Sequence, residues 1–146
     1  MKKIVLMIVL VISVFCSASA FAQEDVITVL VNNRKIESDV APMLVNDRTM
    51  LPMRAIFEAL GAKVTWKEKD QLIFATYREY MLTMQIDNNK MSVQKISSDK
   101  NIAIELDVAP FLHEGRTLVP VRAVAESLEA TVEWIDETQT VVITKK

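Results

Sequence analysis

The chain has 146 residues, a formal net charge of −2 and 51% hydrophobic residues. This length and apolar content suffice for one domain with a core of its own. The mildly acidic composition, without basic clusters, argues against a protein that binds nucleic acid or an anionic membrane through its charge.

Residues 1–22 have the pattern of a secretory signal peptide. Lys2 and Lys3 form a basic start, Ile4–Phe15 is apolar, and Ala20–Ala22 has the A-x-A pattern of a cleavage site. The apolar run is shorter than the roughly 20 residues that a membrane span needs. Cys16 does not follow a small residue, as a lipoprotein cysteine would. We therefore predict export without a membrane anchor after cleavage.

Cleavage would leave residues 23–146, with 15 basic and 19 acidic residues and a formal charge of −4. It would also remove the single cysteine, so the mature core has to form without disulfides. No Pro/Gly/Ser-rich linker divides this part. We predict one domain.

Two β-hairpins are predicted from their turns. Val26–Val31 and Arg34–Ile36 flank two asparagines, a residue type that tolerates positive φ. Tyr80–Ile86 and Lys90–Ile96 flank the turn 87–89 in the same way. The two hairpins align with position 31 against position 86, and position 35 against position 90, which is an offset of 55.

A longer segment occurs twice, at an offset of 68. Arg48–Trp66 reads RTMLPMRAIFEALGAKVTW, and Arg116–Trp134 reads RTLVPVRAVAESLEATVEW. The match begins at the Asp-Val-Ala-Pro sequences of 39–42 and 107–110 and continues without a gap to positions 76 and 144. A match of this length indicates an internal repeat.

The repeated segment predicts a strand, a short helix and two further strands. Pro52 and Pro120 suit the first helical position. Gly61 stands where a helix ends in a left-handed residue, whereas the second copy has Glu129, so that its end is either strained or differently closed. Each helix has one apolar stripe, formed by Met53, Ile56, Phe57 and Leu60 in the first copy and by Val121, Val124, Ala125 and Leu128 in the second.

The strands that follow each predicted helix alternate apolar and polar residues. They are Val64–Trp66 and Val132–Trp134, and tight turns lead from them into Leu72–Ala75 and Val141–Ile143. Trp66 and Trp134 occupy matched positions, where we favour buried anchors over the walls of a carbohydrate groove.

The shared pattern R-T-x-x-P-x-R-A-x-x-E-x-L-x-A-x-V-x-W resembles the copper amine oxidase N-terminal domain-like family, also called stalk domains. The resemblance implies an antiparallel sheet wrapped around a helix, in secreted or surface-attached bacterial proteins. In the amine oxidases the copper and the quinone cofactor belong to another, catalytic domain, which nothing here resembles. The departures are Glu129 in place of the glycine and Ala125 in place of an aromatic residue.

We therefore predict an α+β fold of two repeats, at about 24–77 and 78–146, each with antiparallel strands packed around one short helix. The change of offset from 55 to 68 means that the second copy is longer by 13, and we place these extra residues within Ser92–Leu106. We favour a longer hairpin at the sheet edge for this insertion over an adaptation for binding.

Arg54/Glu58 and Arg122/Glu126 have the i, i+4 spacing of side-chain pairs on a helix. We favour a structural role over a catalytic acid and guanidinium, with Asp39 and Asp107 as further partners of these arginines. Arg54→Ala is then expected to lower the melting temperature markedly.

His113 and the methionines are the candidate metal ligands. His113, beside Glu114, lacks the further ligands of a metal site and the nucleophile of a catalytic dyad, so a surface-loop histidine is favoured. Thioethers can bind Cu(I), but residues 43, 50 and 53 are replaced by Phe, Leu and Val in the second copy, which favours packing. The mature chain has six methionines: Met43, Met50, Met53, Met81, Met84 and Met91.

The sequence lacks a glycine-rich phosphate loop, a G-x-S-x-G motif and an H-E-x-x-H motif. We predict no catalytic residues and no cofactor. The expected function is a secreted interaction or scaffolding module whose partner is a cell-wall component or a surface protein.

The alternative is an extracytoplasmic protein that holds a wall glycan or a small molecule between the repeats, beside exposed Tyr77, Tyr80 or Phe111. A homodimer through a sheet edge is also considered, although charges on the terminal strands argue against it.

Overall fold

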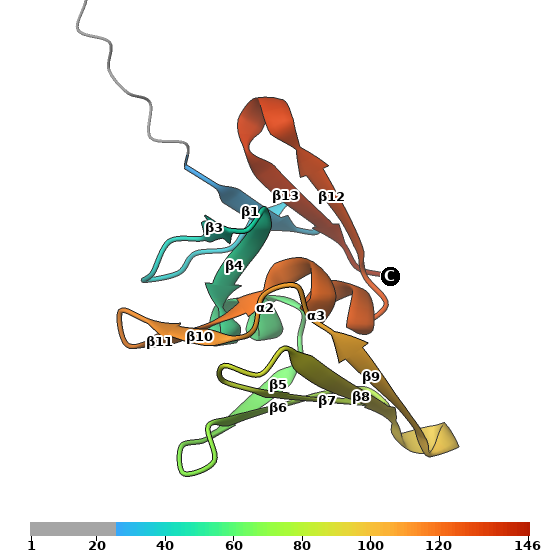
Figure 1. Ribbon diagram of the computed structural model, residues 1–146. Coiled ribbons are helices and arrows are strands. Elements are labelled where there is room, and N and C mark those ends of the chain that lie inside the picture. Colours follow the sequence, from blue (N-terminus) through green and yellow to red (C-terminus); the bar gives the residue numbers. More distant parts are fainter. Residues whose placement is uncertain (1–25) are drawn as a thin grey trace, which may run out of the picture.

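The computed structural model describes residues 26–146, and the predicted signal peptide lies outside this range. The described residues form three sheets and two short α-helices, and Figure 1 shows these helices at the centre of the molecule. No helix in the described range is long and apolar enough to cross a membrane. The α+β class is confirmed, with more sheet than helix.

We refer to residues 26–77 as the first half and to residues 78–146 as the second half. The elements of the first half are β1 (Thr28–Val31), β2 (Arg34–Lys35), β3 (Met43–Val45), β4 (Arg48–Pro52), α2 (Met53–Ala59), β5 (Lys63–Lys67) and β6 (Leu72–Tyr77). Those of the second half are β7 (Tyr80–Gln85), β8 (Lys90–Lys95), η2 (Ile96–Ser98), β9 (Lys100–Glu105), β10 (Phe111–His113), β11 (Arg116–Pro120), α3 (Val121–Ser127), β12 (Thr131–Ile135), η3 (Asp136–Thr138) and β13 (Thr140–Thr144).

Each helix directly follows a strand that ends in a proline. Pro52 and Pro120 are the N-cap residues of α2 and α3, one position earlier than predicted. The eight residues of the two predicted apolar stripes are all buried. The stripes therefore place both helices in the main core, where apolar burial stabilises them.

Both helices end in the same geometry, although only one has a glycine there. Gly61 has a φ of 75° and Glu129 a φ of 63°. The N–H of Ala62 donates to the Phe57 carbonyl over 2.8 Å, and the N–H of Ala130 to the Ala125 carbonyl over 3.0 Å. This is the bonding of a left-handed helix end. Of the two outcomes expected for Glu129, the strained left-handed one is observed.

The halves meet along β4 and β11, in a sheet of order β10-β11-β4-β3. Leu51 lies opposite Val119, and these two residues are equivalent positions of the repeated segment. Met50 lies opposite Pro120, and Pro52 opposite Leu118, so equivalent residues exchange places across this central pair. The register resembles the interface of a two-fold symmetric dimer.

The other two sheets differ by one strand. Their orders are β12-β13-β1-β2 and β5-β6-β7-β8-β9, with β1 parallel to β13 and β7 antiparallel to both neighbours. Because β6 and β8 are both antiparallel to β7, they run in the same direction as each other. The neighbours β13 and β1 also run in the same direction. The counterpart of the hairpin β1–β2 is then β8–β9.

By strand order, β7 has no counterpart in the sheet β12-β13-β1-β2, whereas the sequence comparison placed the extra residues within Ser92–Leu106. Both predicted hairpins exist, and Asn32 and Asn33 have the expected positive φ values of 46° and 64°. Local turn signals identify a hairpin, but they do not reveal which of its strands pairs with the rest of the sheet.

The main core contains buried side chains from both halves and from both helices. A smaller cluster around Val40, Met50 and Leu118 lies apart from it. Four of the six methionines are buried, which agrees with their predicted packing role: Met50, Met53, Met84 and Met91.

Candidate functional site

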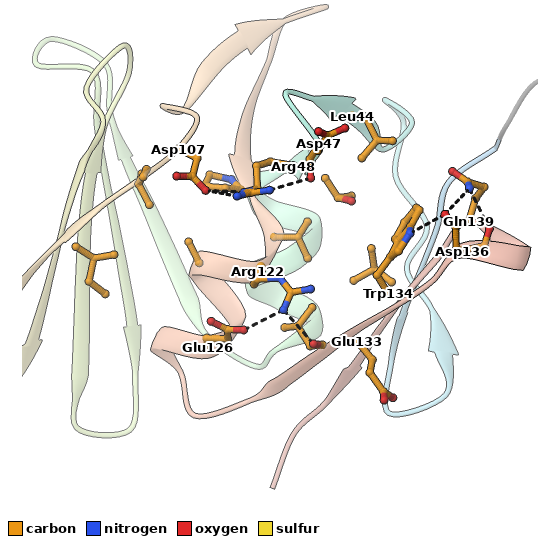
Figure 2. Close-up of a pocket in the computed structure, with 18 of the residues that line it drawn as sticks. Leu44, Asp47, Arg48, Asp107, Arg122, Glu126, Glu133, Trp134, Asp136 and Gln139 are labelled. Atoms are coloured by element: carbon orange, nitrogen blue, oxygen red, sulfur yellow. Dashed lines mark hydrogen bonds and ion pairs between the residues drawn. The ribbon is translucent and has the colours of Figure 1, made fainter.

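A cleft of about 740 Å³ lies where the two halves meet (Figure 2). Its walls come from β3, β4 and the end of β9, and from α3, β12, η3 and β13. Its volume lies within the range of roughly 300–1,000 Å³ that small-molecule sites have. Both halves contribute to it, so it exists only in the assembled fold.

An ion pair between the halves lies at the cleft. Arg48 on β4 donates from Nε to Oδ2 of Asp107 over 2.6 Å, and its Nη2 is also 2.6 Å from that oxygen. Arg48 Nη1 donates to the backbone carbonyl of Asp47 over 3.3 Å. With these contacts the guanidinium is held in place, and it links the first half to the second across the cleft (Figure 2).

The corresponding pair lies outside the cleft. Arg116 donates from Nε to Oδ2 of Asp39 over 2.7 Å, and this hydrogen bond is the main reason why the pKa of Asp39 lies below its ordinary value. Each member of this pair is the repeat equivalent of a member of the first. The two pairs are therefore reciprocal, each joining an aspartate of one half to an arginine of the other.

The sequence identified these two aspartates as partners of arginines, but assigned the wrong arginines. Asp39 and Asp107 bind Arg116 and Arg48, not Arg54 and Arg122. Within residues 26–146, Arg54 makes no hydrogen bond or ion pair through its side chain. Residue spacing within one segment predicts contacts between residues that are near in sequence. It does not predict an ion pair between a residue of the first half and a residue of the second half.

Trp134 forms one wall of the cleft. Its side chain is half-buried and packs against the main core. The indole Nε1 donates to Asp136 Oδ1 over 3.2 Å, and Gln139 donates to the backbone carbonyl of Asp136 over 3.0 Å. The first bond holds the indole beside the open space, and the second holds Asp136 (Figure 2). Trp66 is also half-buried on the core, but it does not line the cleft.

The predicted burial of the two tryptophans is thus only partly right. A matched strand position places both rings against the core, and neither ring is covered completely.

Arg122 on α3 forms the predicted i, i+4 pair with Glu126. Its Nη1 lies 3.4 Å from Glu126 Oε1 and also donates to the backbone carbonyl of Val132 over 3.3 Å. Both side chains are 52% exposed. A pair this open to solvent contributes little to stability, so its main effect is to hold the guanidinium against β12.

The cleft concentrates negative charge. Its lining residues include two arginines and six acidic residues, a formal charge of −4, whereas the 15 basic and 17 acidic residues of 26–146 sum to −2. The remainder of the described chain is therefore net positive by two charges. The six acidic residues are Asp47, Glu105, Asp107, Glu126, Glu133 and Asp136, of which Glu133 points its side chain away from the cleft (Figure 2).

The sequence model of the copper amine oxidase N-terminal domain matches residues 30–143. The chain belongs to this family. The match spans both halves and confirms the family resemblance read from the Arg-Thr and tryptophan motif. A comparison with curated proteins found no match.

In this copper amine oxidase N-terminal domain, His113 lies at the end of strand β10, so the predicted loop position is wrong. Its Nε2 is 3.9 Å from Glu114 Oε1, and its ring meets the edge of Phe111 at 6.5 Å between centroids. Among residues 26–146, no three His, Cys, Asp or Glu side chains gather as metal ligands.

The aromatic residues expected beside a ligand lie elsewhere in the domain. Tyr77, Tyr80 and Phe111 are half-buried and do not line the cleft. Lys145 Nζ lies 4.0 Å from the centre of the Tyr77 ring, and Tyr80 donates its hydroxyl to Glu129 over 2.6 Å. Of the segment Ser92–Leu106, only its last three residues reach the cleft.

Proposed function

We propose that this domain is a secreted, non-catalytic interaction or scaffolding module at the bacterial cell surface, built from two repeats of the stalk type. The signal-peptide pattern supports secretion, and the family match supports a stalk-type module. The symmetric β4–β11 register and the reciprocal ion pairs support two repeats. The partner we propose is a cell-wall component or a surface protein.

The observation that carries this proposal is the cleft between the halves, with the fixed indole of Trp134 on its wall. An open cavity of this size with an aromatic wall suits a binding function. The sequence has no motif of an activated nucleophile or a phosphate loop, which supports binding over catalysis.

The test is co-sedimentation of residues 23–146 with purified cell-wall sacculi across a salt series. This chain keeps every described helix and strand. We expect the wild type to pellet with the sacculi, Trp134→Leu to remain in solution, and the matched variant Trp66→Leu to pellet like the wild type. Circular dichroism checks that both variants are folded. A wild type that stays in solution, or equal loss in both variants, contradicts the proposal.

A second candidate is an extracytoplasmic protein that carries a soluble wall glycan or small molecule in the same cleft. The fixed face of Trp134 favours it, because an indole of this kind can stack on an apolar ligand face. Competition separates the two candidates. Soluble wall fragments that bind as well as sacculi support the carrier, and fragments that fail to displace the protein from sacculi support the surface module.

A further inference from the structure

Strand β9 is the longest of the strands that lie at the edges of the three sheets. Among these edge strands, β2 has two residues, β3 and β10 have three each, β5 and β12 have five each, and β9 has six. Figure 1 shows β9 at the border of its sheet. An edge strand presents unpaired N–H and C=O groups, which can pair with another chain. Within residues 26–146, β9 therefore offers the longest edge for such pairing.

The two edges of five residues are less suited to pairing with another strand. Strand β5 begins and ends with a lysine, so two paired copies of it would bring like charges together. On β12, the carbonyl of Val132 already accepts a hydrogen bond from Arg122 over 3.3 Å. The charged residues of β9, Lys100 and Glu105, have opposite signs and stand at the two ends of the strand. The four residues between them are uncharged.

The backbone of β9 is bonded to β8 at every second residue. The N–H of Leu106 donates to the carbonyl of Asn89 over 2.6 Å, which continues the antiparallel ladder between β8 and β9. The bonding direction alternates along an antiparallel strand, so the odd-numbered residues of β9 direct their N–H and C=O groups to the open edge. These residues are Asn101, Ala103 and Glu105.

An apolar side chain is exposed on β9 where a neighbouring strand is missing. Ile102 lies opposite the buried Val93 and on the same face of the sheet as Ile104, which packs against the main core. Ile102 is nevertheless 59% exposed. Since its face of the sheet is the buried one, its exposure results from the open edge beside it.

We propose that β9 is a self-association edge, which pairs antiparallel with β9 of a second copy of this chain. Ala103 lies opposite Ala103 of the second copy, beside a two-fold axis, and the outward-facing residues of both strands form the backbone hydrogen bonds. The two five-stranded sheets thereby join into one continuous sheet. The last residues of β9 also border the cleft, so the two clefts of the dimer lie on opposite sides of this axis.

The apolar side chains of β9 complement each other in this register. Ile102 lies opposite Ile104 of the second copy, on the buried face of the joined sheet. Each Ile102 then has an apolar neighbour on the side that is open in the single chain. Opposed apolar pairs of this kind stabilise a sheet, and they remove apolar surface from water.

The polar side chains on the other face complement each other as well. Asn101 lies opposite Glu105 of the second copy. The hydroxyl of Ser92 donates to Asn101 Oδ1 over 2.6 Å, which leaves the amide nitrogen of Asn101 as a donor. Asn89 donates to Glu105 Oε1 over 3.3 Å, which leaves Oε2 as an acceptor. The strand therefore carries a donor and an acceptor at positions that meet when it pairs with itself.

The test is sedimentation velocity of residues 23–146 over a concentration series, which measures the equilibrium between monomer and dimer. We expect the wild type to form a concentration-dependent dimer. Ala103→Pro removes an N–H that faces the open edge and no hydrogen bond to β8, and proline is tolerated at such edge positions. It should weaken the dimer at least about tenfold, because both hydrogen bonds of the central pair are lost.

Two lysine variants provide a matched control. Ile102 and Ile96 are 59% and 61% exposed, but only Ile102 belongs to β9. Ile102→Lys should weaken the dimer about tenfold, since a charge replaces the apolar pair, and Ile96→Lys should leave it unchanged. Circular dichroism checks that the variants are folded. A wild type that stays monomeric at every concentration, or equal effects of the two lysine variants, overturns the proposal.

A single cysteine tests the register. Residues 23–146 contain no cysteine, and Ala103→Cys places one beside the two-fold axis. Opposed residues of a hydrogen-bonded antiparallel pair have Cα atoms about 5.5 Å apart, a distance that a disulfide can span. Oxidation should produce a covalent dimer from Ala103→Cys and not from Ile96→Cys. No cross-link through position 103, or equal cross-linking of the two variants, contradicts the pairing of β9 with itself.

Discussion

Phe57 of α2 and Ala125 of α3 occupy aligned positions of the similar segments 48–66 and 116–134, and both are completely buried in the same core. The aromatic ring of one half thus corresponds to a single methyl group in the other. Both halves nevertheless keep the proline before the helix, the left-handed helix end and the aspartate–arginine pair. Both halves have these backbone features, whereas side-chain volume is divided unequally between halves that share one core.

The largest effect is expected from removing the aromatic ring of this pair. Phe57→Ala should lower the free energy of unfolding by about 3–5 kcal/mol, because the ring has no exposed surface and its loss leaves a cavity. Ala125→Gly should cost only about 1 kcal/mol, mainly through helix propensity. Urea denaturation of both variants measures the difference. Similar losses of unfolding free energy in the two variants would show that the two side chains contribute equally to core packing.

A smaller effect is expected at the two helix ends. Gly61→Ala should destabilise by about 1–2 kcal/mol, because the new side chain has to adopt a φ near 75°. A Cβ there would lie 3.4 Å from Lys145 Nζ, a flexible atom that can move, so backbone strain is the main cost. Thermal denaturation measures the loss, and an unchanged melting temperature would contradict it.

Glu129→Gly is the matched change in the second half. It removes the strain of a non-glycine residue at a φ of 63°, and it also removes the acceptor of the Tyr80 hydroxyl. We expect these effects to offset each other and leave stability nearly unchanged. Tyr80→Phe, which removes only the hydrogen bond, should then be the more destabilising of the two variants.

The ion pair between Asp39 and Arg116 should make stability depend on pH. Its hydrogen bond lowers the pKa of Asp39 in the folded state, so the pair stabilises the fold above the ordinary pKa of 3.8. The contribution is lost as the pH falls through the folded-state pKa. We expect the melting temperature of Asp39→Asn to lie below that of the wild type at pH 6 and to converge with it near pH 2.

The lowered pKa of Glu79 does not affect the comparison between the wild type and Asp39→Asn. Its pKa is also lowered, first by the hydroxyl of Ser97 and then by Lys95, but it is present in both proteins. The difference between the two melting curves therefore isolates Asp39. A constant difference from pH 6 to pH 2 would show that the aspartate stabilises the fold through something other than its charge.

Local features of the fold could be predicted from the sequence, and contacts between the halves could not. Apolar spacing gave the buried faces of both helices, and Gly61 marked a left-handed end. These properties depend on neighbours within one turn of chain. The crossed pairing of Asp39 and Asp107 depends on how β4 meets β11, which no local pattern encodes.

The candidate site was predicted only in part for the same reason. Trp134 was considered as a groove residue and Arg122 as a member of a helix pair, but the walls from β4 and β9 come from distant sequence.

Small effects are expected at Arg54 and Arg122, and the one at Arg54 reverses a prediction from the sequence. Arg54→Ala was expected to lower the melting temperature markedly, yet Arg54 is exposed and has no partner within residues 26–146. Its loss should change the free energy of unfolding by no more than about 0.5 kcal/mol. Arg122→Ala should cost somewhat more, up to about 1 kcal/mol, because the bond to the Val132 carbonyl is lost with the pair.

A double-mutant cycle tests this difference between the helices. Coupling between Arg122 and Glu126 should be a few tenths of a kcal/mol, and coupling between Arg54 and Glu58 should be zero within error. Equal coupling in both cycles would mean that Arg54 and Glu58 pair in solution. The two helices would then be held alike, and the contact with β12 would not distinguish Arg122.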